Sequence, residues 1–470
     1  MFERRAERVE QKELWIEARE LPAATPDRFY QRVERTLAEM GFAKEVWQIC
    51  RPAYADVSKG GRPGIDPVVY LKMLMVGFFE DLPSERAIAT RCADSLSIRG
   101  FLGYGWREAT PDHSSLSVIR GRLSQEQFHA IHVVLLRALR GHGLLKGRQL
   151  GIDSSVMEAN ASLRGLVHRN SEESYWDYVR QLAAAAGVDP QDAKAVRRFE
   201  QKRSGRKTSN RDWVNPHDPE AKVGRTKDGA TDMIYKPEHV SDLESGAIVE
   251  AQVRPGDAAD TTQLSERIMA ATFTLAEVAP EAAVEKLGSE LAADEGYFAL
   301  EEIAALQRCG VRTVVADPHA GRRRKDLAPE QAKVLSRARR ATTSQSGRAL
   351  LRRRGQHLER AFCHLLDHGG LRRATLKGCE NLSKRYLAAA MSFNLSLLLR
   401  TLFGIGTTKQ WLAQRGSALW HAFGALAAAL DHLLTGLFVP ESFDAQPNLQ
   451  SQPVSCEHPR LLHGRFSTGC

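Results

Sequence analysis

The sequence contains little cysteine, and the spacing of its cysteines does not predict a framework of disulfide bonds. Seven cysteines occur in 470 residues, and no two of them form a Cys-x-x-Cys pair. Scattered thiols are typical of proteins kept in a reducing compartment, whereas secreted scaffolds are disulfide-dense. The first residues, MFERRAERVEQKELW, also lack the apolar core of a signal peptide. We therefore expect a cytoplasmic protein.

Long uncharged apolar runs and nucleotide-binding loops are also missing. The most apolar segment, LWHAFGALAAALDHLLTGLF near residue 420, is interrupted by His421, Asp431 and His432. This pattern predicts a core helix and no membrane span. The sequence has no Gly-x-x-x-x-Gly-Lys-Ser/Thr loop, no Gly-x-Ser-x-Gly elbow and no convincing His-Glu-x-x-His pattern. These absences argue against a membrane protein, a nucleotide cofactor, an α/β-hydrolase and a zinc peptidase.

Positive charge is in surplus and is unevenly distributed. The net charge is +9, and residues 322–354 contain 12 Lys or Arg against two acidic residues. A basic concentration of this kind suits contacts with the phosphates of a polyanion. A solvated helical surface is the alternative that the pattern leaves open.

Residues 1–145 have the pattern of successive helices. Asp66 is a predicted N-cap, since Pro67 follows it and apolar residues then recur at helical spacing. Ser84 is the predicted cap of a second helix, and Ser124 begins a capping box before a third. Short helices in a basic protein allow a helix-turn-helix that reads DNA, and they equally allow a dimerisation bundle.

A strand and an insert follow this helical region. GRQLGIDSS, beginning at residue 147, predicts a strand. The insert, at about residues 165–230, contains two predicted helices within residues 171–203, the second capped by Asp189. The segment KTSNRDWVNPHDPEAKVGRTKDG is polar and rich in helix and strand breakers, which predicts a loop.

The rest of the chain alternates between strand and helix patterns. Two strands are predicted around Ser245-Gly246, followed by helix, strand, helix, strand and a long closing helix. This order predicts an α/β domain over residues 146–402, in which helices flank a mixed sheet. We expect a further helix and a disordered tail over residues 403–470.

Two aspartates and a glutamate stand out as candidate metal ligands. Asp153 closes a predicted strand, where an unpaired charge is costly unless it caps a turn or binds a cation. Asp294 occupies the same kind of position, and Glu359 lies in the closing helix. Three carboxylates can hold two Mg²⁺ ions about 3.5–4 Å apart, an arrangement suited to phosphodiesters. Asp317 and Asp260 are rivals that the pattern does not exclude.

Several motifs, taken together, resemble the DDE transposases of bacterial insertion sequences. IDSSVMEANAS and ADEGYF resemble the two aspartate motifs, and RRRGQHLERAFCHLLDHGG resembles the segment that carries the glutamate. GIDPVVYLKMLMVGFFEDLPSERAIATRC resembles the family's helical N-terminal domain. The motifs occur in the right order over roughly residues 60–402. The resemblance implies a ribonuclease-H-like catalytic domain behind an all-α domain at residues 1–145 that binds DNA or dimerises.

The resemblance also implies the chemistry and the partners. Asp153, Asp294 and Glu359 would bind two Mg²⁺ ions, with Mn²⁺ as a substitute. The protein would cleave phosphodiesters at the ends of its element and join the 3′-hydroxyls to target DNA. It would act as a homo-oligomer on terminal repeats and target DNA in the bacterial cytoplasm, associated with the nucleoid when bound. Contacts with DNA are expected from basic residues near the glutamate, namely Arg322, Arg323, Arg324, Lys325, Arg352, Arg353, Arg354, Arg372 and Arg373.

One departure from the family pattern lies around Glu359. Many relatives carry a tyrosine and an arginine before the glutamate and a lysine seven residues after it. Here these places hold Arg352, Gly355 and Leu366. This departure bears on the positioning of DNA ends more than on metal binding. A first alternative is an inactive or repurposed copy that binds DNA without cutting it, although the presence of all three carboxylates argues against it. A second alternative is a structural helical protein, whose affinity for DNA would respond little to salt.

Overall fold

The protein is α/β, as predicted, and its described part begins at Arg28 and ends at Ala413. The computed structural model describes residues 28–54, 64–105, 107–204, 209–282, 286–321 and 327–413. The predictions for Arg322 to Lys325, for the apolar segment near residue 420 and for the tail lie outside these ranges.

The N-terminal part consists of helices, and α3, α4 and α7 begin at the three predicted caps. Asp66, Ser84 and Ser124 each accept a hydrogen bond from a backbone N–H of the first turn of their helix. Such side chains satisfy donors that have no partner within the helix. The helices are α1 (Arg28–Glu39), α2 (Phe42–Cys50), α3 (Pro67–Phe79), α4 (Glu85–Asp94), α5 (Leu96–Phe101), α6 (His113–Arg122) and α7 (Gln125–Gly141).

A mixed sheet of seven strands forms the second part. Strand β1 lies between β6, which is antiparallel to it, and β8, which is parallel. Strand β9 extends the parallel side, and β6 and β7 form the predicted hairpin. The strands are β1 (Gln149–Ser154), β2 (Met157–Glu158), β5 (Lys222–Arg225), β6 (Thr231–Asp242), β7 (Ile248–Pro255), β8 (Glu290–Ala293) and β9 (Arg312–Val315).

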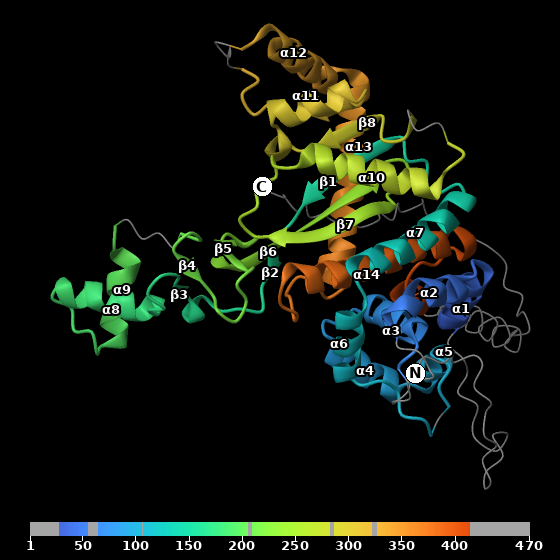
Figure 1. Ribbon diagram of the computed structural model, residues 1–470, viewed down its shortest axis with the longest axis horizontal. Helices are drawn as coiled ribbons and strands as arrows, with labels where there is room; N and C mark the ends of the chain where they lie inside the picture. The colour runs from blue at the N-terminus through green and yellow to red at the C-terminus, as the bar shows by residue number, and fades with distance from the viewer. Residues whose placement is uncertain are drawn as a thin grey trace, which may run out of the picture. The chain divides into compact units, whose positions relative to one another are not determined.

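Helices cover both faces of this sheet (Figure 1). One face packs against α10 and α11, and the other packs against α13. Gly151 allows α13 to lie close to β1, because a Cβ atom at that position would lie 2.9 Å from a methyl group of Leu358. The helices of this part are α10 (Leu264–Val278), α11 (Leu300–Arg308), α12 (Pro329–Thr343) and α13 (Gln345–Phe362).

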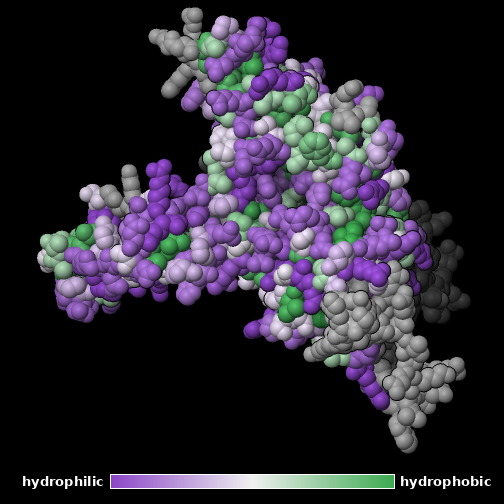
Figure 2. Space-filling view, in the orientation of Figure 1, coloured by the Kyte–Doolittle hydropathy of each residue, from purple (hydrophilic) through white to green (hydrophobic). Residues whose placement is uncertain are grey.

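The insert forms a separate projection from the sheet, with a largely hydrophilic surface (Figures 1 and 2). The predicted cap of its second helix is wrong, because that helix begins after Asp192. Asp192 accepts hydrogen bonds from two backbone N–H groups of the first turn, whereas Asp189 accepts one in the preceding turn. Two short strands lie in the segment predicted to be a loop. The elements are β3 (Val167–His168), α8 (Tyr175–Ala185), α9 (Ala193–Lys202), β4 (Trp213–Val214) and β5.

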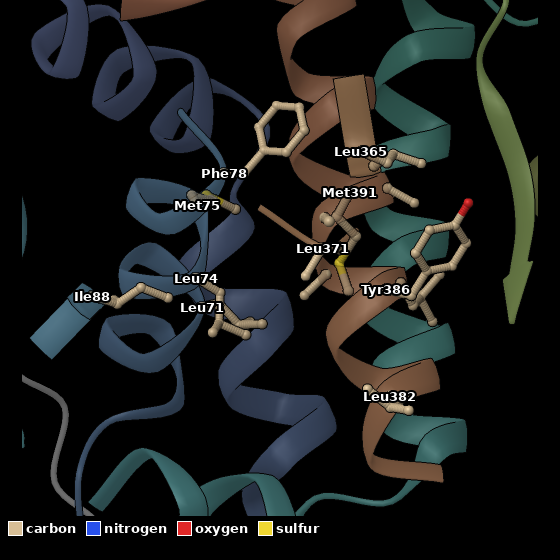
Figure 3. Packing of buried hydrophobic residues seen from close by; sticks show 14 of the residues in the cluster. Leu71, Leu74, Met75, Phe78, Ile88, Leu365, Leu371, Leu382, Tyr386 and Met391 are labelled. Carbon is tan, nitrogen blue, oxygen red and sulfur yellow. The ribbon is translucent and has the colours of Figure 1, made fainter. Parts of the chain in front are cut away.

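The helix α14 (Cys379–Phe403) is shared by the two parts, and its existence was not predicted. It packs against α3 and α7 of the N-terminal part and against β7 of the sheet. Figure 3 shows apolar side chains of α3 directed toward α14. By length and composition the segment Cys379–Ala413 could cross a membrane, but 67% of its apolar window is buried inside the protein. It is therefore a core helix in this structure.

Candidate active site

Asp153 and Asp294 lie at the same edge of the sheet. Because β1 and β8 are parallel neighbours, their carboxyl ends meet there. Side chains two residues apart on a strand lie on the same face. Asp153 therefore shares a face with Gly151, and Asp294 shares it with Ala292, which packs against α13. Both aspartates thus lie on the face that α13 covers.

Arg354 of α13 lies between the two carboxylates. Its Nη2 atom is 2.7 Å from Oδ2 of Asp153 and 3.9 Å from Oδ2 of Asp294. The Nε and Nη2 groups of Arg354 are buried and donate no hydrogen bond. The contact with Asp153 is therefore an ion pair without hydrogen-bond alignment. The sequence indicated Arg354 as a DNA-binding residue and gave no sign that it would lie between the aspartates.

The charged form of Asp153 is poorly stabilised in the folded protein. The pKa of Asp153 is raised to about 6, chiefly by burial and to a smaller extent by the Asp294 and Asp260 carboxylates. The Arg354 guanidinium and the N–H of Ser154 act in the opposite direction. Since a carboxylate with a raised pKa is poorly stabilised in its charged form, an additional cation would be favourable here.

Glu359 lies on α13, five residues after Arg354, and its side chain is exposed. A Cβ atom on Gly355 would lie 3.6 Å from its Oε1 atom, so the carboxylate lies over the preceding turn. Within the described ranges, no three His, Cys, Asp or Glu side chains are close enough to hold one metal ion. The role of Glu359 as a third ligand stays a prediction.

The two rival aspartates have different surroundings. Asp260 lies beside the site, where its Oδ1 accepts a hydrogen bond from the Ser154 hydroxyl at 2.8 Å and pairs with Lys236 at 2.8 Å. Asp317 follows β9, and its Oδ2 accepts hydrogen bonds from Nε and Nη2 of Arg339 at 3.0 and 2.6 Å. Asp317 is thus engaged in a pair away from Arg354.

A buried ion network on β6, the strand paired with β1, supports the site, and it was not predicted from the sequence. Glu238 on β6 is 1% exposed and lies opposite Ser154 of β1. It pairs with Arg254 and Arg267, and it accepts a hydrogen bond from the Tyr297 hydroxyl at 2.8 Å. The network ties β6 to the segment that follows Asp294. The available signal was weak, because Glu238 lies in a strand that also contains other polar and charged residues.

The predicted basic residues on α13 extend away from the carboxylates. Arg352 and Arg353 are exposed, and Arg353 donates a hydrogen bond from Nη1 to Oε1 of Gln149 at 3.0 Å. A hollow in the surface beside them is lined by Gln345, Arg348, Leu351 and Arg352. This side of α13 therefore carries exposed positive charge on the same helix as Arg354.

Arg372 and Arg373 differ from each other in their surroundings. Arg372 donates from Nε to Asp367 and from Nη1 to the Val156 carbonyl, both at 2.8 Å. It therefore holds the segment that follows Asp153. Arg373 is exposed. The remaining basic candidates, Arg322 to Lys325, lie outside the described residues.

A comparison with protein families identifies the N-terminal helices. Residues 20–122 match the family model described as Transposase domain (DUF772). The match supports a transposase family. In the described residues, this transposase domain comprises α1 to α6. A transposase acts on DNA, so the match also implies a DNA-processing enzyme with DNA as its partner. No curated protein and no solved structure matches the chain.

Proposed function

We propose that this protein is a transposase that uses DDE chemistry. It would cleave phosphodiesters at the ends of its element and join the freed 3′-hydroxyls to target DNA. The observation that carries the proposal is the meeting of Asp153 and Asp294 at Arg354. They lie at the carboxyl ends of neighbouring parallel strands, where sites in α/β sheets commonly form. A mixed sheet with helices on both faces also supports a ribonuclease-H-like catalytic domain.

The residues present fit a divalent metal. Carboxylate oxygens are the ligands that Mg²⁺ prefers, and the raised pKa of Asp153, due chiefly to burial, means that its charged form is poorly stabilised without a further cation. Asp153, Asp294 and Glu359 would hold two Mg²⁺ ions, for which Mn²⁺ would substitute. When bound, such metals supply activation of a water or a 3′-hydroxyl and stabilisation of the leaving oxygen.

The chain's own residues would hold and orient the DNA. Arg352 and Arg353 offer exposed positive charge on α13, the helix that carries Arg354, and Arg348 adds to it in the adjacent hollow. Phosphate contacts of this kind position a duplex without reading its sequence. Arg373 and the segment Arg322 to Lys325 would extend the same surface. Arg372, by holding the Val156 carbonyl, would keep Asp153 in place.

The N-terminal transposase domain would bind the terminal repeats or pair two protomers. Transposition joins two DNA ends, so we propose a homo-oligomer on DNA, acting in the bacterial cytoplasm. Phosphate contacts release counterions, and binding should therefore weaken steeply as salt increases.

The test is nicking of a labelled duplex that carries the ends of the element, with Mg²⁺ present. We compare the unmodified protein with Asp294→Asn, which keeps the shape of the side chain and removes its charge. Glu295→Gln is the matched control, because it changes the adjacent exposed carboxylate. We expect nicking by the unmodified protein and the control, and none by Asp294→Asn.

The other outcomes distinguish the alternatives. Equal nicking by Asp294→Asn would show that this aspartate is not a ligand. Binding of the duplex without nicking by any variant would identify a repurposed copy that only binds DNA. Absence of salt-sensitive binding would favour a structural helical protein.

A further inference from the structure

Arg354 occupies the place that a cation shared by the two aspartates would need. Its Nη2 atom lies within 4 Å of both Oδ2 atoms, and its side chain is only 13% exposed. Mg²⁺ binds oxygen at about 2.0–2.1 Å. A divalent cation held by Asp153 and Asp294 would compete with the guanidinium for these oxygens, and the two positive charges would repel each other. At these atoms, Arg354 and a divalent cation exclude each other.

The ion pair also lacks the hydrogen bonds that would hold a buried arginine in place. Its Nε and Nη2 groups are buried and donate no hydrogen bond, although unpaired buried donors are costly. These two groups form one edge of the guanidinium, which matches two oxygens of a phosphate. A DNA phosphate would thus satisfy donors that Asp153 leaves unsatisfied.

We propose that Arg354 is a displaceable counter-ion of Asp153 and Asp294, which keeps a divalent cation out until a DNA phosphate takes its guanidinium. The inference rests on the proposed function, because it takes DNA as the source of the phosphate. It makes metal binding and DNA binding mutually favourable. Such coupling is reciprocal, so each partner must strengthen the binding of the other by the same factor.

The test is a titration of the full chain with Mn²⁺, with and without a short DNA duplex, in which free Mn²⁺ is measured by electron paramagnetic resonance. Without DNA, Arg354→Gln should bind Mn²⁺ at least about tenfold more tightly than the unmodified protein, a change of about 1.4 kcal/mol. The duplex should tighten Mn²⁺ binding by the unmodified protein and should have little effect on Arg354→Gln.

Two further variants serve as controls. Arg352→Gln removes the same charge from an exposed position on α13, and its Mn²⁺ affinity without DNA should stay within about twofold of the unmodified value. Arg354→Lys keeps a cation but lacks the paired donors of a guanidinium. It should bind Mn²⁺ weakly without DNA and gain less from the duplex. If circular dichroism shows that Arg354→Gln is not folded, Arg354→Lys provides the test.

Equal or weaker Mn²⁺ binding by Arg354→Gln overturns the proposal, as does equal tightening by DNA in the unmodified protein and Arg354→Lys. If the unmodified protein nicks DNA in either case, the proposed function stands and only this inference fails. If Asp153→Asn binds Mn²⁺ as the unmodified protein does, the metal site itself is wrong and both fail.

Discussion

Two aspartate–arginine pairs lie at the ends of parallel strands and are built differently. Asp317 accepts two hydrogen bonds from Arg339, and its other oxygen accepts the N–H of His319 at 3.0 Å. Its side chain is fully buried. Asp153 lies 2.7 Å from Arg354 without an aligned hydrogen bond to it. The first pair is closed and structural, whereas the second is open to an exchange of partners.

The difference follows from the two-residue period of a strand. Asp153 and Asp294 share the face of Gly151 and Ala292, where small residues let α13 lie close. Asp317 lies two residues after Val315, whose side chain packs in the cluster on the opposite face. Its arginine accordingly comes from α12. Each of the three aspartates lies at the end of a parallel strand, yet Asp317 contacts a different helix. The reason is that alternate residues of a strand face opposite sides of the sheet.

The largest expected effect is the loss of nicking in Asp153→Asn. We expect the rate to fall by about a thousandfold, roughly 4 kcal/mol in activation free energy, because the carboxylate charge is removed from the metal site. Asp317→Asn should keep the rate within about tenfold when equal amounts of folded protein are compared. Nicking of a labelled duplex measures both, and a comparable loss in the two variants would erase the distinction between the pairs.

The two positions should rank in the opposite order when the free energy of unfolding is measured. Asp317→Ala removes the two hydrogen bonds that Arg339 donates to the buried carboxylate and should lower the free energy of unfolding by roughly 1.5–3 kcal/mol. Asp153→Asn should change it by less than about 1 kcal/mol, because the raised pKa of Asp153 means that its charged form gains no net stabilisation over a neutral side chain in the folded protein. Urea unfolding at pH 7 provides the measurement. A greater loss in Asp153→Asn than in Asp317→Ala would mean that the open pair is the structural one.

The position of α13 can be tested through Gly151→Ala. The added Cβ would lie 2.6 Å from Leu243 and 2.9 Å from Leu358, both flexible side-chain ends, so α13 must shift slightly. We expect a loss of about 1–3 kcal/mol in unfolding free energy and slower nicking. Gly121→Ala in α6 is the control, since nothing lies within 4 Å of its added Cβ. Equal unfolding curves for the two variants would contradict close packing of α13 on β1.

The smallest effect concerns added metal. With a short DNA duplex present, Mg²⁺ at tenfold excess over its dissociation constant should stabilise the unmodified protein by about 1.4 kcal/mol, visible as an increase in thermal midpoint. Asp317→Asn should show the same increase and Asp153→Asn should show none. An increase in Asp153→Asn as well would place the stabilising ion elsewhere.

Local features of this fold could be predicted because local residues determine them. The caps at Asp66, Ser84 and Ser124 depend on side chains within three residues of the N–H groups they accept. The hairpin around Ser245-Gly246 depends on its turn, in which Gly246 has φ of +81°. The cap at Asp189 failed because Asp192, three residues later, satisfies two donors of the helix.

The candidate site could be predicted only in part. Asp153 and Asp294 were found because each ends a strand pattern, and their meeting requires the parallel pairing of β1 and β8. The sequence could not separate Asp317 from them, since the face of each strand depends on which helix packs there. Arg354 was placed on the right helix, but its position between the carboxylates depends on the rotation of α13 about its axis.

The position of α14 affects the order in which the chain can fold during its synthesis. This helix covers α3 and β7, yet it is made roughly 300 residues after α3. At about 5–20 residues per second, the apolar side chains of α3 wait roughly 15–60 s for it on the ribosome. A nascent chain that ends before Cys379 therefore lacks the cover of both its helical part and its sheet. Under the proposed function, premature termination would disable DNA recognition and catalysis together, and a shortened product would not compete for DNA ends as a folded inhibitor.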